Sequence, residues 1–177
     1  APVAIAYLDG GPKYAVIDPE AKDVATLKML MASFPGTLVV PTSRTHDGKE
    51  MIFSVTSDRE PGRYYLLDKS GKATYLFASR EWIKADDMAE MQPITLKARD
   101  GLRLDGYLTV PKGSSGKNLP MIVHPHGGPF GPYDAWGFNR DVQMMASRGY
   151  AVLQVNFRGS GNYGRTRSEQ RQGSTSR

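Results

Sequence analysis

Residues 119–155, LPMIVHPHGGPFGPYDAWGFNRDVQMMASRGYAVLQV, decide the fold class of this chain. An apolar run at 119–123 ends in a glycine-rich turn, a helical pattern covers 139–149, and a second apolar run covers 150–155. Strands that are buried on both faces lose the alternation of polar and apolar residues, and a strand–helix–strand order implies a right-handed parallel crossover. The stretch therefore predicts an α/β sheet.

More strands are predicted upstream. Polar and apolar residues alternate within 93–110, on both sides of the turn Arg99-Asp100-Gly101. The two halves of this stretch are expected to form two strands. Further strands are expected at 3–8, 14–18, 50–56, 63–68 and 73–78. The first two form a hairpin around Asp9-Gly10-Gly11, and Met51, Phe53 and Val55 share one face of the third.

One helix is predicted among these N-terminal strands. Asp18-Pro19 supplies a cap and a first turn, and Pro35-Gly36 stops the helix. Its apolar stripe consists of Val24, Leu27, Met31 and Phe34. Repeated groups of short strands are typical of β-propeller blades, which cannot bury their faces alone. The alternative is a small open sheet packed on the helix.

Composition excludes several classes of protein. The chain has no cysteine, so it has no disulfides, thiolate metal sites or cysteine nucleophile. No apolar run approaches the roughly 18 residues that a membrane-spanning helix needs. We expect a soluble protein, cytoplasmic or periplasmic, with no membrane partner, no cofactor and no metal site.

The net charge of +5 does not indicate nucleic-acid binding. Residues 165–177 hold four arginines against one glutamate, and elsewhere no basic stripe with interleaved aromatic residues occurs. We therefore expect no nucleic-acid partner. This tail contains no apolar residue, and we expect it to be disordered or non-native.

The glycine-rich turn at His126-Gly127-Gly128-Pro129 is the candidate site. In open α/β sheets, chemistry takes place just beyond the carboxyl ends of the strands, where this turn lies. Glycines there allow backbone N–H groups to approach a ligand, as in the oxyanion hole of α/β-hydrolases. The alternative is a tight connection in which the glycines only avoid strain.

Two segments carry a family resemblance: MQPITLKARDGLRLDGYLTVP at 91–111 and LPMIVHPHGGPF…VNFRGSGNYG at 119–164. They resemble the prolyl oligopeptidase family of serine peptidases, especially bacterial enzymes similar to acylaminoacyl peptidase and dipeptidyl aminopeptidase. Upstream strands, including SRTHDGKEMIFSVTSDREPGRYYLLD, resemble the last blades of that family's β-propeller. The resemblance implies three parts: C-terminal propeller blades at 1–80, the N-terminal half of an α/β-hydrolase sheet at 81–164, and the tail at 165–177. The strand at 150–155 would then lack its next neighbour.

The resemblance also implies a serine in a G-x-S-x-G elbow, followed by an acid and a histidine. None of the three is present: no segment has that spacing, and no histidine follows His126. We therefore expect the chain to be inactive by itself. After the resembling segment, the family continues into an amphipathic helix with aromatic anchors, which the tail lacks, so we expect the chain to be truncated or altered after about Gly164. His46 is expected to be a solvated loop residue and His124 to end its strand with a structural hydrogen bond.

By the same resemblance, Gly127 and Gly128 form the oxyanion turn, and the Gly128 N–H is the better donor. His126 stands where prolyl oligopeptidase and dipeptidyl peptidase IV carry a tyrosine, so it either assists the oxyanion or packs the loop. Arg158 is expected to be structural, and Ser160 is not expected to be a nucleophile.

The expected function is that of a fragment of a serine exopeptidase or oligopeptidase, which acts on short peptides through an acyl-enzyme. The expected partners are a peptide substrate and the remainder of the hydrolase domain and propeller. Two alternatives stay open: a non-catalytic interaction module that uses exposed sheet edges, and a parent enzyme that is an esterase.

Overall fold

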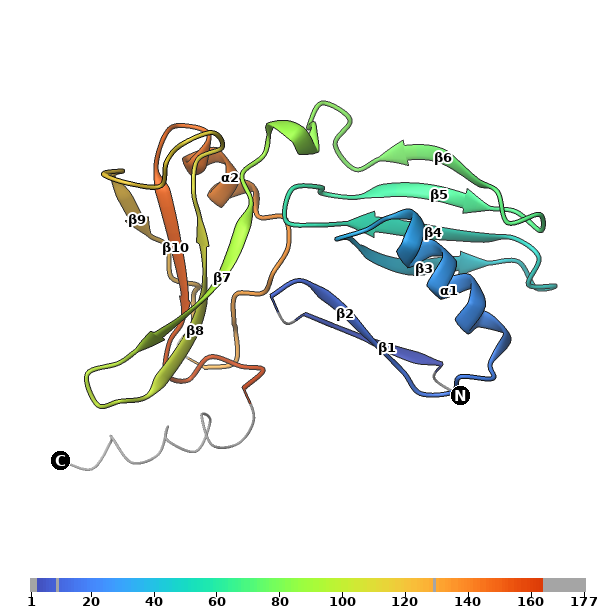
Figure 1. Ribbon diagram of the computed structural model, residues 1–177, viewed down its shortest axis with the longest axis horizontal. Coiled ribbons are helices and arrows are strands. Elements are labelled where there is room, and N and C mark those ends of the chain that lie inside the picture. Colours follow the sequence, from blue (N-terminus) through green and yellow to red (C-terminus); the bar gives the residue numbers. More distant parts are fainter. Residues whose placement is uncertain (1–2, 9, 129, 164–177) are drawn as a thin grey trace. The chain divides into compact units, whose positions relative to one another are not determined.

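A computed structural model describes residues 3–8, 10–128 and 130–163 of this chain. These residues form two compact units (Figure 1): residues 3–88 together with 136–139, and residues 89–135 together with 140–163. The tail predicted at 165–177 lies outside the described residues. No helix in the described residues combines the length and the hydropathy that a membrane-spanning segment requires.

The first unit is built from antiparallel strands and one helix. β1 and β2 form a two-stranded sheet, and β3 to β6 form a four-stranded sheet in chain order. The elements are β1 (Ala4–Leu8), β2 (Pro12–Val16), α1 (Lys22–Ser33), β3 (Leu38–Arg44), β4 (Met51–Thr56), β5 (Arg63–Leu67) and β6 (Ala73–Ala78). The five strands predicted in this region are confirmed to within a few residues.

The core of the first unit is centred on Phe53. Its side chain is fully buried, and its ring lies 5.6 Å from that of Phe34 and 5.4 Å from that of Tyr65. Met51 and Val55 are buried on the same face of β4, which confirms the predicted alternation. Burying aromatic rings against one another removes a large apolar area from water and stabilises this sheet.

The prediction for α1 was wrong at its start. Asp18 does not cap the helix, because its Oδ1 accepts a hydrogen bond from the Glu20 N–H at 3.1 Å and closes a tight turn. The helix begins at Lys22, after Ala21 in an extended conformation. The predicted apolar stripe also omitted Leu30, which is 1% exposed. The predicted end at Pro35-Gly36 is confirmed, since Gly36 adopts φ +71°.

The strand β3 was missed by the sequence analysis. Pro41 interrupts the pattern of this stretch and cannot donate a hydrogen bond to a neighbouring strand. The structure accommodates it at the edge of the sheet, with a register shift between Pro41 and Ser43 in the pairing with β4. Proline in sheets is largely confined to such edges and bulges.

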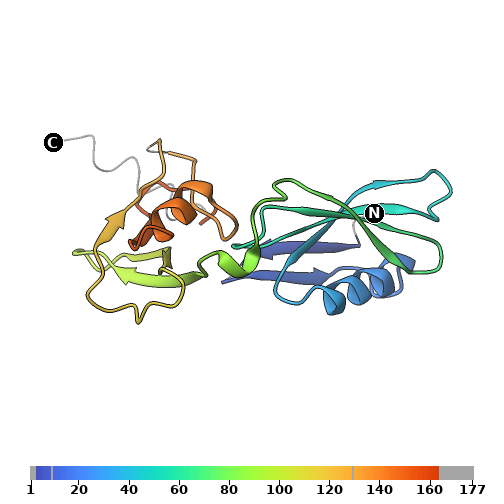
Figure 2. The same cartoon turned by 90° about the horizontal axis from the view of Figure 1, so that it is seen from above.

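The second unit holds a mixed sheet with the strand order β7-β8-β10-β9. β9 and β10 are parallel and the other pairs are antiparallel, so the parallel pairing predicted for the strand–helix–strand stretch is confirmed. Figure 2 shows α2 on one face of this sheet. Its elements are β7 (Met91–Lys97), β8 (Arg103–Thr109), β9 (Met121–Val123), α2 (Arg140–Ala146) and β10 (Ala151–Asn156). A short 3-10 helix, η1 (Ala85–Asp87), precedes β7 in the chain and belongs to the first unit.

Two expectations about this sheet were wrong. β9 was expected to be buried on both faces, but it is an edge strand whose Met121 and Val123 are 56% and 57% exposed. β10 was expected to lack a neighbour, but it is paired on both sides, because the crossover through α2 returns the chain between β8 and β9. Within the described residues, the open edge on this side of the sheet therefore belongs to β9.

Candidate active site

Two loops meet at one edge of the mixed sheet. The first loop follows β9 and is described at 124–128 and 130–135, and the second loop, 157–163, follows β10. Because β9 and β10 are parallel, both loops leave the carboxyl ends of their strands at the same edge. The Gly131 N–H donates to the Gly159 carbonyl at 3.3 Å, and the Gly161 N–H donates to the Pro132 carbonyl at 3.1 Å.

Glycine at 161 allows this close approach. A Cβ at that position would lie 2.1 Å from the Gly131 carbonyl oxygen, a distance that no side chain tolerates. The two loops can therefore join backbone to backbone only if residue 161 has no side chain.

His126 links the first loop to the second. Its Nδ1 lies 2.9 Å from the Gly127 carbonyl oxygen, and its Nε2 lies 2.8 Å from the Ser160 Oγ. The imidazole ring also stacks on Phe157, with ring centroids 4.4 Å apart. A carbonyl oxygen can only accept a hydrogen bond, so Nδ1 carries the proton. In the neutral ring, Nε2 then accepts the hydrogen bond that the Ser160 hydroxyl donates.

The His126 ring also fixes the direction of the Gly128 N–H. The Gly127 carbonyl and the Gly128 N–H belong to one peptide group, and no cis peptide bond occurs among the described residues. In a planar trans peptide the two groups point in opposite directions. While His126 holds the carbonyl, the N–H therefore points away from the ring. It makes no hydrogen bond to any described residue, and Gly128 is exposed.

The two glycines of this turn have different structural requirements. Gly128 adopts φ +110°, and a Cβ there would lie 3.2 Å from Pro132. A side chain at 128 would thus strain the backbone and crowd the loop. A Cβ at Gly127 would have nothing within 4 Å. The conformation therefore requires glycine at 128 alone.

The geometry of Ser160 and His126 differs from that of a nucleophile and its base. Ser160 is only 3% exposed, so its hydroxyl is not open to a substrate. In a catalytic triad the second ring nitrogen of the histidine faces a carboxylate that stabilises the imidazolium, whereas here it faces a neutral carbonyl. The arrangement instead holds the ring in place.

Neither of the other two histidines joins this site. His46 is exposed in the turn after β3. The predicted hydrogen bond at His124 is made by its backbone N–H, which donates to the Leu153 carbonyl at 2.8 Å and continues the pairing of β9 with β10.

A buried polar network beneath the loops was missed by the sequence analysis. The Asn156 side chain accepts from the Asp134 N–H at 2.7 Å and donates to the Asp134 carbonyl at 2.8 Å and the Tyr163 hydroxyl at 2.7 Å. The Gln154 Nε2 donates to Asp134 Oδ1 at 2.7 Å. The available signal was the presence of two amide side chains in an otherwise apolar strand, since such groups are buried only when they are hydrogen-bonded.

Arg158 forms an ion pair with Asp100, in the turn between β7 and β8. A hydrogen bond from the Leu102 N–H, and then the Arg158 guanidinium, hold the pKa of Asp100 below its usual value. This contact anchors the start of the second loop and agrees with the structural role expected for Arg158.

Nowhere in the described parts of the chain do three or more histidine, aspartate or glutamate side chains cluster so that they could hold a metal ion.

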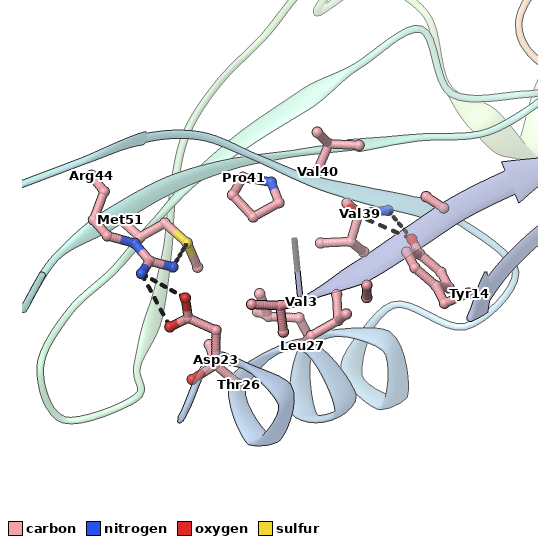
Figure 3. A pocket seen from close by; sticks show the side chains of 13 residues that line it. Val3, Tyr14, Asp23, Thr26, Leu27, Val39, Val40, Pro41, Arg44 and Met51 are labelled. Carbon is pink, nitrogen blue, oxygen red and sulfur yellow. Dashed lines mark hydrogen bonds and ion pairs between the residues drawn. The ribbon is translucent and has the colours of Figure 1, made fainter. Parts of the chain in front are cut away.

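The first unit contains a separate, mostly apolar cavity of about 280 Å³. It lies between α1, the β1–β2 hairpin and β3, and Arg44 donates from Nη1 to both carboxylate oxygens of Asp23 at one side of it (Figure 3). Tyr14 lines another part, and its hydroxyl is hydrogen-bonded to the backbone of Val39. None of the predicted site residues lines this cavity.

The chain is similar to known peptidases. The Prolyl oligopeptidase family profile matches residues 136–174. Dipeptidyl aminopeptidase BIII of Pseudoxanthomonas mexicana is 35% identical over 171 residues, which cover 92% of this chain and 24% of that relative. The chain thus spans about a quarter of that relative's length.

Solved structures agree with this similarity. Acylaminoacyl peptidase of Pyrococcus horikoshii matches 69% of this chain and 19% of its own, with 31% identity and a TM-score of 0.51. A puromycin-hydrolyzing peptidase of Mycobacterium tuberculosis matches 94% of this chain and 26% of its own, with a TM-score of 0.61 and 20% identity, which shows a shared fold. This chain is a relative of the prolyl oligopeptidase family of serine peptidases and corresponds to part of its acylaminoacyl peptidase and dipeptidyl aminopeptidase members.

Proposed function

We propose that this chain is the segment of a serine peptidase that supplies an oxyanion-hole donor, the Gly128 N–H, to a reaction that cleaves short peptides through an acyl-enzyme. Residues 1–80 would be the last blades of a β-propeller, and residues 81–164 the first half of the hydrolase domain. The observation that carries the proposal is the peptide group of Gly127 and Gly128. His126 holds its carbonyl, and its N–H points away from that ring without a partner among the described residues.

Such a donor acts on the transition state. When a serine attacks a peptide carbonyl, negative charge develops on the carbonyl oxygen, and a fixed N–H stabilises that charge more than it stabilises the ground state. The nucleophile, acid and base are absent from this sequence and would come from the remainder of the protein.

The β9 edge supports this arrangement. A further parallel strand could pair with β9 at this open edge. Parallel strands have their carboxyl ends on the same side of a sheet, so that strand would end beside the first loop. A nucleophile at the carboxyl end of that strand would then face the Gly128 N–H.

The test is to replace the Gly128 N–H by an ester oxygen, using glycolic acid at position 128 in a catalytically complete protein that contains this sequence. This change removes the donor without adding a side chain. We expect kcat for a peptide p-nitroanilide to fall by about 10²- to 10³-fold with little change in KM. Proline at 128 would not be a clean test, because it fixes φ near −65° whereas Gly128 adopts +110°. An unchanged kcat would show that the turn is only a connection.

A second candidate function is that of an interaction module, and the exposed β9 edge favours it. Such a module would bind a partner strand, and the ester at position 128 would not change that binding. A chain that binds partners but forms part of no peptide- or ester-hydrolysing protein would support this candidate over the first.

A further inference from the structure

We infer that Ser160 is a positioning residue for the oxyanion turn: its hydroxyl fixes the tautomer and orientation of His126, and through that ring the direction of the Gly128 N–H. The inference rests on the proposed function for its catalytic consequence, but its structural part stands on contacts within the second unit.

The first step is the choice of tautomer. A neutral imidazole carries one proton, which can sit on either ring nitrogen. The Gly127 carbonyl, 2.9 Å from Nδ1, requires the proton on that nitrogen. The Ser160 hydroxyl, 2.8 Å from Nε2, can donate and so satisfies the nitrogen that has no proton. Without this hydroxyl, Nε2 would lose its hydrogen-bond donor, and the tautomer that releases the Gly127 carbonyl would become more favourable.

The second step is the rigidity of Ser160 itself. Ser160 is buried, and its backbone N–H donates to the Phe157 carbonyl at 3.0 Å. Phe157 also supplies the ring that stacks on His126. The hydroxyl and the ring of Phe157 therefore hold the imidazole from two directions. A hydrogen bond offered from a buried, fixed position orients its partner better than one offered by a mobile side chain.

The third step carries the orientation to the reacting atoms. The Gly127 carbonyl and the Gly128 N–H turn together as one planar group. If the imidazole releases the carbonyl, nothing described on that side of the turn holds the peptide group in its orientation, and flanking glycines lower the barrier to rotation. Loss of the Ser160 hydroxyl should therefore weaken transition-state binding rather than substrate binding.

The first test observes the ring directly in this chain. Nitrogen-15 spectra of labelled histidine separate protonated from unprotonated ring nitrogens, and His46→Gln and His124→Gln variants identify the signals of His126. We expect the neutral ring to be in the Nδ1–H form in the unsubstituted chain and in a mixture of the two tautomers in Ser160→Ala. If the unsubstituted chain shows the Nε2–H form, or if Ser160→Ala leaves the spectrum unchanged, the inference is overturned whether or not the protein is a peptidase.

The second test measures the catalytic consequence in a catalytically complete protein that contains this sequence. We expect Ser160→Ala to lower kcat about fivefold to tenfold, as for the loss of one hydrogen bond, with KM nearly unchanged. Affinity for a peptide aldehyde, whose adduct carries an oxyanion, should fall by the same factor. Ser147→Ala is the matched control: it also removes a serine hydroxyl, one bonded to the Met144 carbonyl in α2, and should leave both values unchanged.

A double-mutant cycle separates positioning from general loop damage. In His126→Asn, the amide can donate to the Gly127 carbonyl without a tautomer to be set. Adding Ser160→Ala to this variant should therefore cost much less than it costs in the unsubstituted protein. Equal losses in both backgrounds would refute the positioning role. A complete absence of peptide hydrolysis would instead refute the proposed function and leave the spectroscopic test to decide the role of Ser160.

Discussion

A methyl group at residue 161 should separate the two loops of the candidate site. In Gly161→Ala, the new Cβ would start 2.1 Å from the Gly131 carbonyl oxygen. The new Cβ and the Gly131 carbonyl oxygen are both attached directly to the backbone, so neither atom can rotate away. The loops must therefore move apart by about 1 Å for this distance to reach even the tightest contact range of 3.0–3.4 Å.

This movement breaks identifiable interactions. The hydrogen bonds from Gly161 N–H to Pro132 and from Gly131 N–H to Gly159 already measure 3.1 and 3.3 Å, so a further 1 Å abolishes them. At about 0.5–1.5 kcal/mol each, their loss should cost roughly 1–3 kcal/mol of stability. The 2.8 Å contact between His126 and Ser160 should lengthen as well, and a displacement of about 1 Å at a reacting group can cost on the order of 10²-fold in rate.

The assay combines thermal unfolding with kinetics on a peptide p-nitroanilide in a catalytically complete protein that contains this sequence. Gly127→Ala is the control, because a Cβ there meets nothing within 4 Å and the residue needs no positive φ. We expect a lower Tm and a large loss of kcat for Gly161→Ala and a near-normal Tm for Gly127→Ala. If Gly161→Ala kept both its Tm and its kcat, the close packing of the loops described above would be incorrect.

The 177-residue chain should hydrolyse neither peptide p-nitroanilides nor p-nitrophenyl esters above buffer, because it lacks a nucleophile; turnover that Ser160→Ala abolishes would contradict this. The isolated chain should self-associate through the open β9 edge, so Val123→Lys should lower its apparent mass in sedimentation, and a monomeric unsubstituted chain would argue against it. The pKa of Asp100 is lowered in the folded state. Its carboxylate therefore contributes fully to stability at pH values above its pKa in the unfolded chain, and this contribution is lost as the pH falls through its pKa in the folded state. The stability difference between the unsubstituted protein and Asp100→Asn should accordingly shrink in the acidic range below the ordinary aspartate pKa, and a difference that stays constant with pH would exclude this role for the ion pair.

Local sequence patterns predict the class of every helix and strand except β3 and η1, and they predict the place of the turn. The alternation at Met51, Phe53 and Val55 and the apolar run at 150–155 are local patterns, and each reports on how many faces of its strand are buried. Strand β3 was not predicted, because it contains Pro41. A strand accommodates proline when it lies at the edge of a sheet, as β3 does. The order of strands in a sheet cannot be read from the local sequence.

The assembly of the site depends on the order and direction of the strands. His126, Gly127 and Gly128 are neighbours in the sequence, but Phe157 and Ser160 reach the imidazole only because the parallel crossover brings the ends of β9 and β10 to one edge. The pairing of Asp134 with Asn156 and the insertion of β10 between β8 and β9 have the same origin. Contacts between residues of the two loops depend on the topology of the chain. The sequence pattern of one loop does not indicate which residue of the other loop will contact it.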